Sequence, residues 1–160
     1  MRLFISIQIS KELQRSITGT MHELKKAGVR GNYVPAQNLH LTLAFIGETD
    51  DVQAVRAALQ SIKVKPFRLS LSGLGTFGDL LWIGLKGNQG LSRIVKEVRA
   101  ALDSAGIPYD RKEFRPHITV IRKMSGNWKT VTDPSGEMMV KKISLMRSVV
   151  RDGKRVYTEV

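Results

Sequence analysis

The sequence contains no cysteine, and no segment approaches the roughly 20 apolar residues that cross a membrane. The first absence excludes disulfides, thiolate nucleophiles and cysteine-based metal sites. The second excludes a membrane-spanning helix, and residues 1–9 lack an apolar stretch long enough for a signal peptide. We therefore expect a cytoplasmic protein without a membrane partner.

Acidic residues are few relative to basic ones. Asp and Glu number 14 against 26 Lys and Arg, which gives a net charge of +12. This balance favours polyanionic partners or substrates, although a solvated basic surface gives a similar total. The 160 residues fit one domain or two small lobes that share a core, and we expect a monomer.

Histidine is scarce as well, and two of the three histidines begin related tetrapeptides. The sequence His40-Leu41-Thr42-Leu43 returns 77 residues later as His117-Ile118-Thr119-Val120. Both runs read as β-strands, in which successive side chains point to opposite faces. Each histidine thus shares a face with its threonine, while the opposite face is apolar and is expected to be buried. The residues predicted on that face are Leu39, Leu41, Leu43 and Phe45 in the first run, and Ile118 and Val120 in the second.

A single pair of this kind would mean little, because strand histidines are often hydrogen-bonded surface residues and threonine favours strands. The repetition changes the interpretation. The chain has nine threonines. The probability that a threonine lies two positions after each of these two histidines by chance is about three in a thousand. The third histidine, His22, lies beside the apolar stripe of a predicted helix and is expected to be solvated.

Apolar periodicity predicts three helices and a series of strands. The helices are expected at 10–27 (N-cap Ser10, ending before Gly28), at about 50–62 (capped by Thr49 or Asp50) and from about 91 to Gly106. The strands are expected at 2–9, 39–45, 67–72, 81–85, 117–122, 141–150 and 156–160, with an Asp152-Gly153 hairpin before the last.

Two local patterns are expected to have no function. Gly73, Gly75 and Gly78 have the spacing of a dinucleotide fingerprint, but they join two strand-like runs and do not open a helix. We interpret them as a loop. The outer side of the third helix carries Arg93, Lys96 and Arg99, which we interpret as a solvated face.

The 77-residue shift superposes more than the histidines. It carries strand 2–9 onto 79–86, helix 10–27 onto 87–104 and strand 67–72 onto 144–149. Only the second helix lacks a counterpart, because residues 127–139 contain Pro134, Gly136 and other turn residues. The pattern predicts two related β-α-β-containing halves, each of which supplies one His-x-Thr strand.

Two imidazoles across a cleft suit a reaction in which one group accepts a proton and another donates one. Their ordinary pKa of about 6.5 permits either role at neutral pH. Each threonine lies about 6.5 to 7 Å along the strand from its histidine, so a phosphate held between the imidazoles can reach both hydroxyls. Zinc is a weaker alternative, since no carboxylate or cysteine accompanies either motif at ligand spacing.

At these residues the sequence resembles the two-histidine phosphoesterases, and among them the RNA 2',3'-cyclic phosphodiesterases, also called 2'-5' RNA ligases. The residues that carry the resemblance are Tyr33-Val34-Pro35, Asn38-Leu39-His40-Leu41-Thr42-Leu43, Phe45-Ile46-Gly47 and Phe114-Arg115-Pro116-His117-Ile118-Thr119-Val120-Ile121-Arg122. One departure is Tyr33, where many relatives carry tryptophan. The likeness spans essentially the whole chain.

The resemblance implies one two-lobed α+β domain over residues 1–160. Two antiparallel sheets would be related by a pseudo-twofold axis, with helices outside and both motifs in a central cleft. It further implies hydrolysis of RNA 2',3'-cyclic phosphate ends to 2'-phosphomonoesters without a metal or cofactor, and reversible 2'-5' ligation. In this reading His117 is the general base, His40 the general acid, and Thr42, Thr119 and Arg122 bind the phosphate. The symmetry of the two motifs leaves acid and base interchangeable.

Two other functions stay open. The substrate can be a small cyclic phosphate, such as ADP-ribose 1'',2''-cyclic phosphate or a cyclic dinucleotide fragment. The chain can also be a nucleotide- or RNA-binding module without turnover, although a binder has no need of two titratable groups placed symmetrically. The net charge of +12 weakly favours RNA over a small molecule.

Overall fold

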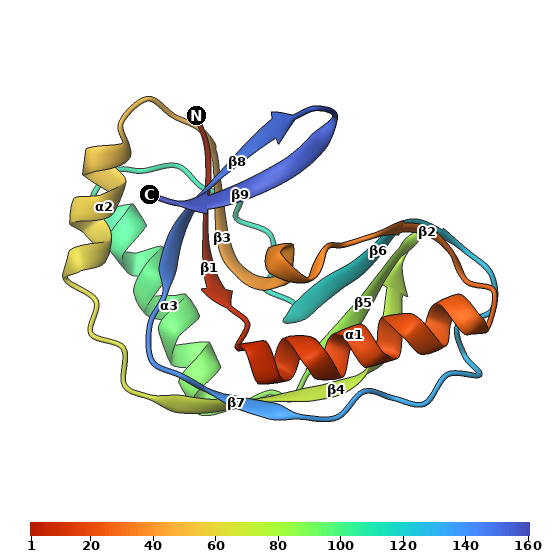
Figure 1. The fold of residues 1–160 in the computed structure, drawn as a ribbon. Helices are drawn as coiled ribbons and strands as arrows, with labels where there is room; N and C mark the ends of the chain where they lie inside the picture. Colours follow the sequence, from red (N-terminus) through yellow and green to blue (C-terminus); the bar gives the residue numbers. More distant parts are fainter.

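The alternating apolar runs form two antiparallel β-sheets, and the amphipathic segments form three α-helices (Figure 1). The computed structural model describes all residues from 1 to 160. Its strands are β1 Arg2–Gln8, β2 Arg30–Tyr33, β3 His40–Glu48, β4 Phe67–Phe77, β5 Leu80–Leu85, β6 His117–Ser125, β7 Glu137–Val140, β8 Ser144–Arg151 and β9 Lys154–Glu159. Its helices are α1 Lys11–Lys26, α2 Val52–Gln60 and α3 Gln89–Ser104, with a 3-10 turn at Ala36–Asn38. The predicted α+β fold is confirmed.

The two sheets repeat one another. Their strand orders are β3-β1-β8-β9 and β2-β6-β5-β4-β7, so the triplet β3-β1-β8 corresponds to β6-β5-β4. The 77-residue shift relates these same strands and also carries α1 onto α3. Strands β2 and β7 were not predicted, because each is only four residues long and lacks a clear apolar alternation.

The helices lie outside the sheets. Figure 1 shows α1 running along the five-stranded sheet, with α2 and α3 packed together beside the four-stranded sheet. Their apolar sides pack against the apolar faces of both sheets, opposite the His–Thr pairs, in one cluster of 30 buried residues. None of the helices is long and apolar enough to cross a membrane.

The helix caps differ in one place from the prediction. Ser10 caps α1 as expected, because its side chain accepts a hydrogen bond from the Leu13 amide. Helix α2 is capped by Asp51, whose carboxylate accepts from the Ala54 amide, so the prediction of Thr49 or Asp50 is wrong by one or two residues. The Thr49 hydroxyl instead accepts from the Asp51 amide and fixes the turn before the helix.

The prediction of a glycine loop after residue 72 is also wrong. Strand β4 continues through Gly73 and Gly75 to Phe77, and the turn lies only at 78–79. Gly75 serves close packing, because a Cβ built there would lie 2.4 Å from the ring of Trp82 on the neighbouring strand. A glycine required by a bulky neighbour looks, in sequence, like a glycine required by a turn.

We expect Gly75→Ala to lower the free energy of unfolding by about 1–3 kcal/mol, since the added methyl group must displace the indole ring. Chemical denaturation measures this loss. Gly87→Ala is the matched control, because no atom lies within 4 Å of its Cβ position and its φ is ordinary. Equal stability of the two variants would show that the Trp82 ring moves aside at no cost.

Strand β3 contains a β-bulge that changes which residues face away from the core. Between Thr42 and Ala44, strand β1 offers no partner for Leu43, so Leu43 and Ala44 are both buried. Phe45 consequently turns to the face of Thr42 and is 55% exposed. The prediction that Phe45 faces the core is wrong, because the bulge reverses the strand alternation.

The same bulge recurs in β6. Strand β5 has no partner for Val120, and Val120 and Ile121 are both buried. Arg122 lies five residues after His117, so strict alternation would put the two side chains on opposite faces. The bulge brings them to the same cleft, and it places Arg122 at the position equivalent to Phe45 in the other half.

Candidate active site

The two histidine strands line one cleft of about 460 Å³, which we call the histidine cleft. Strands β3 and β6 lie against one another, so side chains from both halves of the chain meet there. The residues that sequence analysis singled out all line this cleft: His40, Thr42, His117, Thr119 and Arg122. The structure therefore brings the five predicted site residues together.

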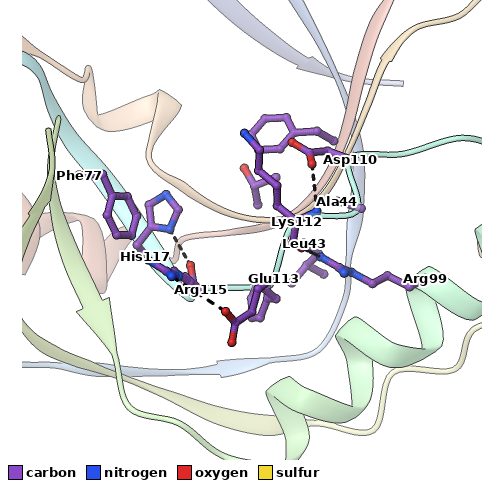
Figure 2. A pocket seen from close by; sticks show the side chains of 12 residues that line it. Leu43, Ala44, Phe77, Arg99, Asp110, Lys112, Glu113, Arg115 and His117 are labelled. Atoms are coloured by element: carbon purple, nitrogen blue, oxygen red, sulfur yellow. Dashed lines mark hydrogen bonds and ion pairs between the residues drawn. The ribbon is translucent and has the colours of Figure 1, made fainter. Parts of the chain in front are cut away.

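Both imidazoles are held in the same way. The Nδ1 atom of His40 lies 2.7 Å from the carbonyl oxygen of Asn38, and that of His117 lies 2.7 Å from the carbonyl oxygen of Arg115. Figure 2 shows the second contact as a dashed line. A carbonyl oxygen can only accept, so Nδ1 carries the hydrogen in both rings. This leaves Nε2 of each neutral ring free to accept a proton, and Nε2 of each protonated ring free to donate one.

His40 lies among aromatic rings. Its ring centroid is 4.9 Å from that of Phe4 and 5.2 Å from that of Tyr157, which stands edge-on. Burial lowers the pKa of His40, and the positive charges of Arg122 and His117 lower it further, while the backbone hydrogen bond partly opposes them. The neutral form of His40 is therefore favoured in the free protein.

The surroundings of His117 are different. Phe77, at the end of β4, stands edge-on to His117 at 5.1 Å and is itself 38% exposed (Figure 2). Phe77 also packs against Trp82 at 5.3 Å. Aromatic contact thus accompanies both histidines, but the rings come from strand positions that the 77-residue shift does not relate.

Positive charge dominates the histidine cleft. Arg2, Arg122 and Arg155 line it, with Asp110 as the one acidic residue. None of the three arginines forms an ion pair within the protein, although Arg155 donates to the Ser148 hydroxyl at 3.1 Å. Guanidinium groups without carboxylate partners favour a bound phosphate.

Among the cleft residues that sequence analysis missed are two arginines and two aromatic residues: Arg2, Phe4, Arg155 and Tyr157. The alternation of β1 already placed Phe4 on the face opposite Leu3 and Ile5, and the first strand could have been searched for site residues on that ground. No sequence signal places β9 close enough to His40 to contribute Tyr157 and Arg155. That neighbourhood depends on the pairing of β8 with β1.

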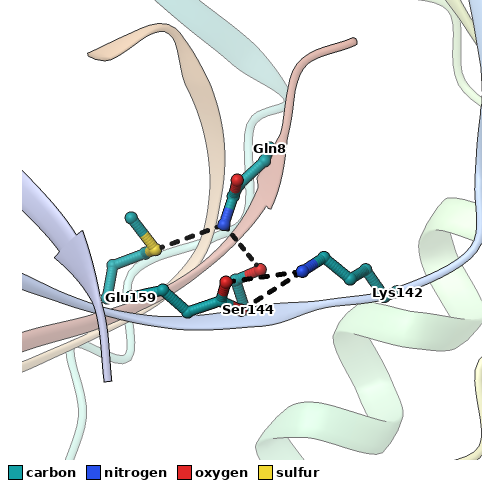
Figure 3. Close-up of polar contacts among 5 residues, drawn as sticks. Gln8, Lys142, Ser144 and Glu159 are labelled. Carbon is teal, nitrogen blue, oxygen red and sulfur yellow. Dashed lines mark hydrogen bonds and ion pairs between the residues drawn. The ribbon is translucent and has the colours of Figure 1, made fainter. Parts of the chain in front are cut away.

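A polar network fixes the hairpin that carries Tyr157 (Figure 3). On β1, the Gln8 amide donates to the Ser144 hydroxyl at 2.9 Å, and Lys142 donates to the Glu159 carboxylate at 3.4 Å. Burial raises the pKa of Glu159, but hydrogen bonds from Ser144 and Lys142 outweigh it and hold that pKa below its usual value. The charged carboxylate thus helps to tie β9 to β1, the strand that pairs with β3 at His40.

The structure brings few metal-ligating side chains together. No group of three or more His, Asp or Glu side chains comes together to hold one. The zinc alternative therefore lacks a third protein ligand beside the two histidines. The arrangement suits proton transfer by two imidazoles instead.

A second cavity adjoins the histidine cleft, and α3 sends one arginine into it (Figure 2). Arg99 is half-buried and donates from Nη2 to the carbonyl oxygen of Lys112 at 2.8 Å. The prediction that Arg99 belongs to a solvated face is therefore wrong, whereas Arg93 and Lys96 are exposed as expected. The segment at 110–115 folds against this side of α3, which helical periodicity alone does not reveal.

Comparison with known proteins agrees with this geometry. The model of the 2'-5' RNA ligase superfamily matches residues 12–152. The chain is 34% identical to the RNA 2',3'-cyclic phosphodiesterase of Aquifex aeolicus over 99% of this chain and 94% of that protein. It is 29% identical to the protein of the same name from Archaeoglobus fulgidus, over 100% and 98% of the two chains. The crystal structure of E. coli LigT in apo form superposes with a TM-score of 0.84 at 27% identity, covering 99% of this chain and 94% of that one. The chain belongs to the 2'-5' RNA ligase superfamily.

Proposed function

We propose that this protein hydrolyses the 2',3'-cyclic phosphate at the end of an RNA to a 2'-phosphomonoester, by acid–base catalysis with two histidines. The observation that carries the proposal is the meeting of both His–Thr pairs with Arg122 in one cleft. Relatives that match nearly the whole chain share the name RNA 2',3'-cyclic phosphodiesterase, which supports the substrate class. One chain supplies the complete cleft, so a monomer suffices.

Each of the five predicted site residues has one role in the proposed reaction. Nε2 of His117 takes a proton from water, whose oxygen attacks the phosphorus as the bond to the 3'-oxygen breaks. Nε2 of His40 donates a proton to that departing oxygen, so the phosphate stays on the 2'-oxygen. The hydroxyls of Thr42 and Thr119 donate to the free phosphate oxygens, and Arg122 offsets their negative charge. No metal takes part.

The lowered pKa of His40 bears on its proposed role as the acid. Burial and nearby positive charge favour the neutral ring in the free protein, yet a general acid must hold a proton when the reaction begins. A bound phosphate brings negative charge beside the ring, which raises the pKa of His40 again. Binding of the substrate and protonation of His40 are therefore coupled. The phosphate whose 3'-oxygen must receive a proton also stabilises the protonated form of His40.

The cleft alone does not fix the length of the substrate. A crystal structure of E. coli LigT contains 3'-AMP, and it resembles this chain with a TM-score of 0.80 at 28% identity. By analogy, the histidine cleft accommodates the terminal nucleotide. The exposed Arg2 and Arg155 at its border are then placed to meet the rest of an RNA strand.

A salt series distinguishes RNA from a small cyclic phosphate. We expect the affinity for an oligonucleotide with a 2',3'-cyclic end to fall with salt, with a slope of about −0.7 per phosphate contacted. Hydrolysis of a cyclic mononucleotide should depend on salt much less, because its single phosphate lies between the histidines. Michaelis constants for both substrates over the series give the comparison. Equal salt dependence would favour the small-molecule substrate.

A further inference from the structure

The second cavity has about the same volume as the histidine cleft, about 460 Å³, and opens beside His117. Its walls come from β3, the end of β4, α3 and residues 110–115 (Figure 2). Thr42, Phe45, Asp110 and His117 line both spaces, so the two are continuous. Of these two spaces, His40 lines only the histidine cleft. A group held in the second cavity therefore borders one histidine and not the other.

Aromatic rings form much of the wall of this cavity. Phe45 and Phe77 are two of the few large apolar side chains that remain exposed, at 55% and 38%. Phe114 contributes a third ring and is partly buried against the core. Exposed rings around a cavity of this size favour a flat aromatic ligand, and nucleic-acid bases stack on such rings irrespective of sequence.

The polar groups of the cavity favour an uncharged ligand. Arg99, Lys112 and Arg115 are accompanied by Asp110 and Glu113, so the charges nearly balance, in contrast to the histidine cleft. Within the protein the Arg99 side chain donates only one hydrogen bond, from Nη2 to the carbonyl oxygen of Lys112. Its remaining terminal N–H groups can therefore donate to an acceptor atom on a ligand. A nucleoside offers a flat base together with such acceptors and carries no charge.

We propose that the second cavity is an acceptor pocket for the nucleoside whose 5'-hydroxyl takes the place of water when two RNA ends are joined. The proposal rests on the proposed function, in which His117 is the base that activates the attacking group. A nucleophile must lie beside this base, and the second cavity is the space that borders His117 without bordering His40.

The joining reaction is balanced without water. The 5'-hydroxyl gives its proton to Nε2 of His117, and its oxygen forms a bond to phosphorus as the bond to the 3'-oxygen breaks. The 3'-oxygen receives its proton from His40, which leaves a 2'-5' phosphodiester. In the reverse direction the 3'-hydroxyl attacks, and the nucleoside in the acceptor pocket departs with a free 5'-hydroxyl.

Two substrates that differ only by the acceptor nucleoside test this assignment. The first is the 2'-5'-linked dinucleotide of adenosine, whose cleavage releases adenosine, and the second is 2',3'-cyclic AMP. We expect Phe114→Ala and Arg99→Met to lower kcat/KM for dinucleotide cleavage by about tenfold or more, as for loss of one stacking partner. Hydrolysis of 2',3'-cyclic AMP should change far less. Lys96→Met, exposed on the same helix, should change neither reaction.

Thermal unfolding of each variant checks that it is folded. If Phe114→Ala proves unstable, the activity of Arg99→Met tests the acceptor assignment. An equal fall in kcat/KM for both reactions would mean that the cavity serves the cyclic-phosphate nucleotide, and it would overturn the acceptor assignment. Undiminished dinucleotide cleavage in both variants would overturn it too, as would a wild-type protein that hydrolyses 2',3'-cyclic AMP but never cleaves the dinucleotide. A wild-type protein inactive on 2',3'-cyclic AMP would instead refute the proposed function, and the acceptor pocket with it.

Discussion

Replacement of His40 or His117 by alanine is expected to lower turnover of a 2',3'-cyclic phosphate substrate by at least about a hundredfold, as for loss of a general acid or base. In each histidine a carbonyl oxygen holds Nδ1, and Nε2 is the atom that transfers the proton in the cleft. Alanine removes that atom. Single-turnover assays on the purified variants measure the loss.

His22→Ala is the control for this experiment, because His22 is exposed on α1 and lines neither cavity. It should retain the full rate. A near wild-type rate in either His40→Ala or His117→Ala would refute the two-histidine mechanism.

The second large effect is expected from the threonines. Thr42→Val and Thr119→Val keep the β-branched shape but remove the hydroxyl, and each should lower kcat by about tenfold to a hundredfold, as for loss of one donor to a reacting oxyanion. Both side chains are half-buried at the cleft, and neither hydroxyl forms a hydrogen bond within the protein. Stability should therefore stay within about 0.5 kcal/mol of wild type.

Thr76→Val serves as the matched control, since Thr76 is a half-buried strand threonine outside both cavities. It should leave kcat unchanged. If Thr42→Val or Thr119→Val lowers the melting temperature sharply while activity per folded molecule is retained, the hydroxyls support the fold and do not bind phosphate.

The sequence predicted much of this site because strand periodicity and the repeat agree. His40 and His117 begin strands of equal length, and the strand and helix β1 and α1 match β5 and α3 under the 77-residue shift. Apolar alternation then determined which face each His–Thr pair occupies. This information is local, so it could be read without knowledge of the packing.

The bulges were not predictable in the same way. An extra residue such as Leu43 or Val120 leaves no mark on composition, yet it reverses the alternation for everything that follows. Phe45 was misplaced for this reason. Arg122 was assigned correctly to the cleft only through the family resemblance, since alternation alone would have buried it.

Residues that depend on long-range packing were also beyond the sequence. Arg99 lies between buried positions of α3, and only the segment at 110–115 turns it into a cavity wall. Arg155 and Tyr157 reach the cleft because β8 pairs with β1. The pairing of β8 with β1 joins residues more than a hundred positions apart, and neither contact leaves a local pattern in the sequence.

The central claim is tested most directly by the product isomer. An oligonucleotide ending in a 2',3'-cyclic phosphate is incubated with the protein in excess EDTA, and the terminal phosphate is identified by phosphorus NMR. Because one histidine protonates the 3'-oxygen and no metal takes part, we expect a single 2'-phosphomonoester, formed at the rate seen without EDTA. A 3'-phosphomonoester, a mixture of both isomers, or loss of activity in EDTA would contradict the proposed mechanism.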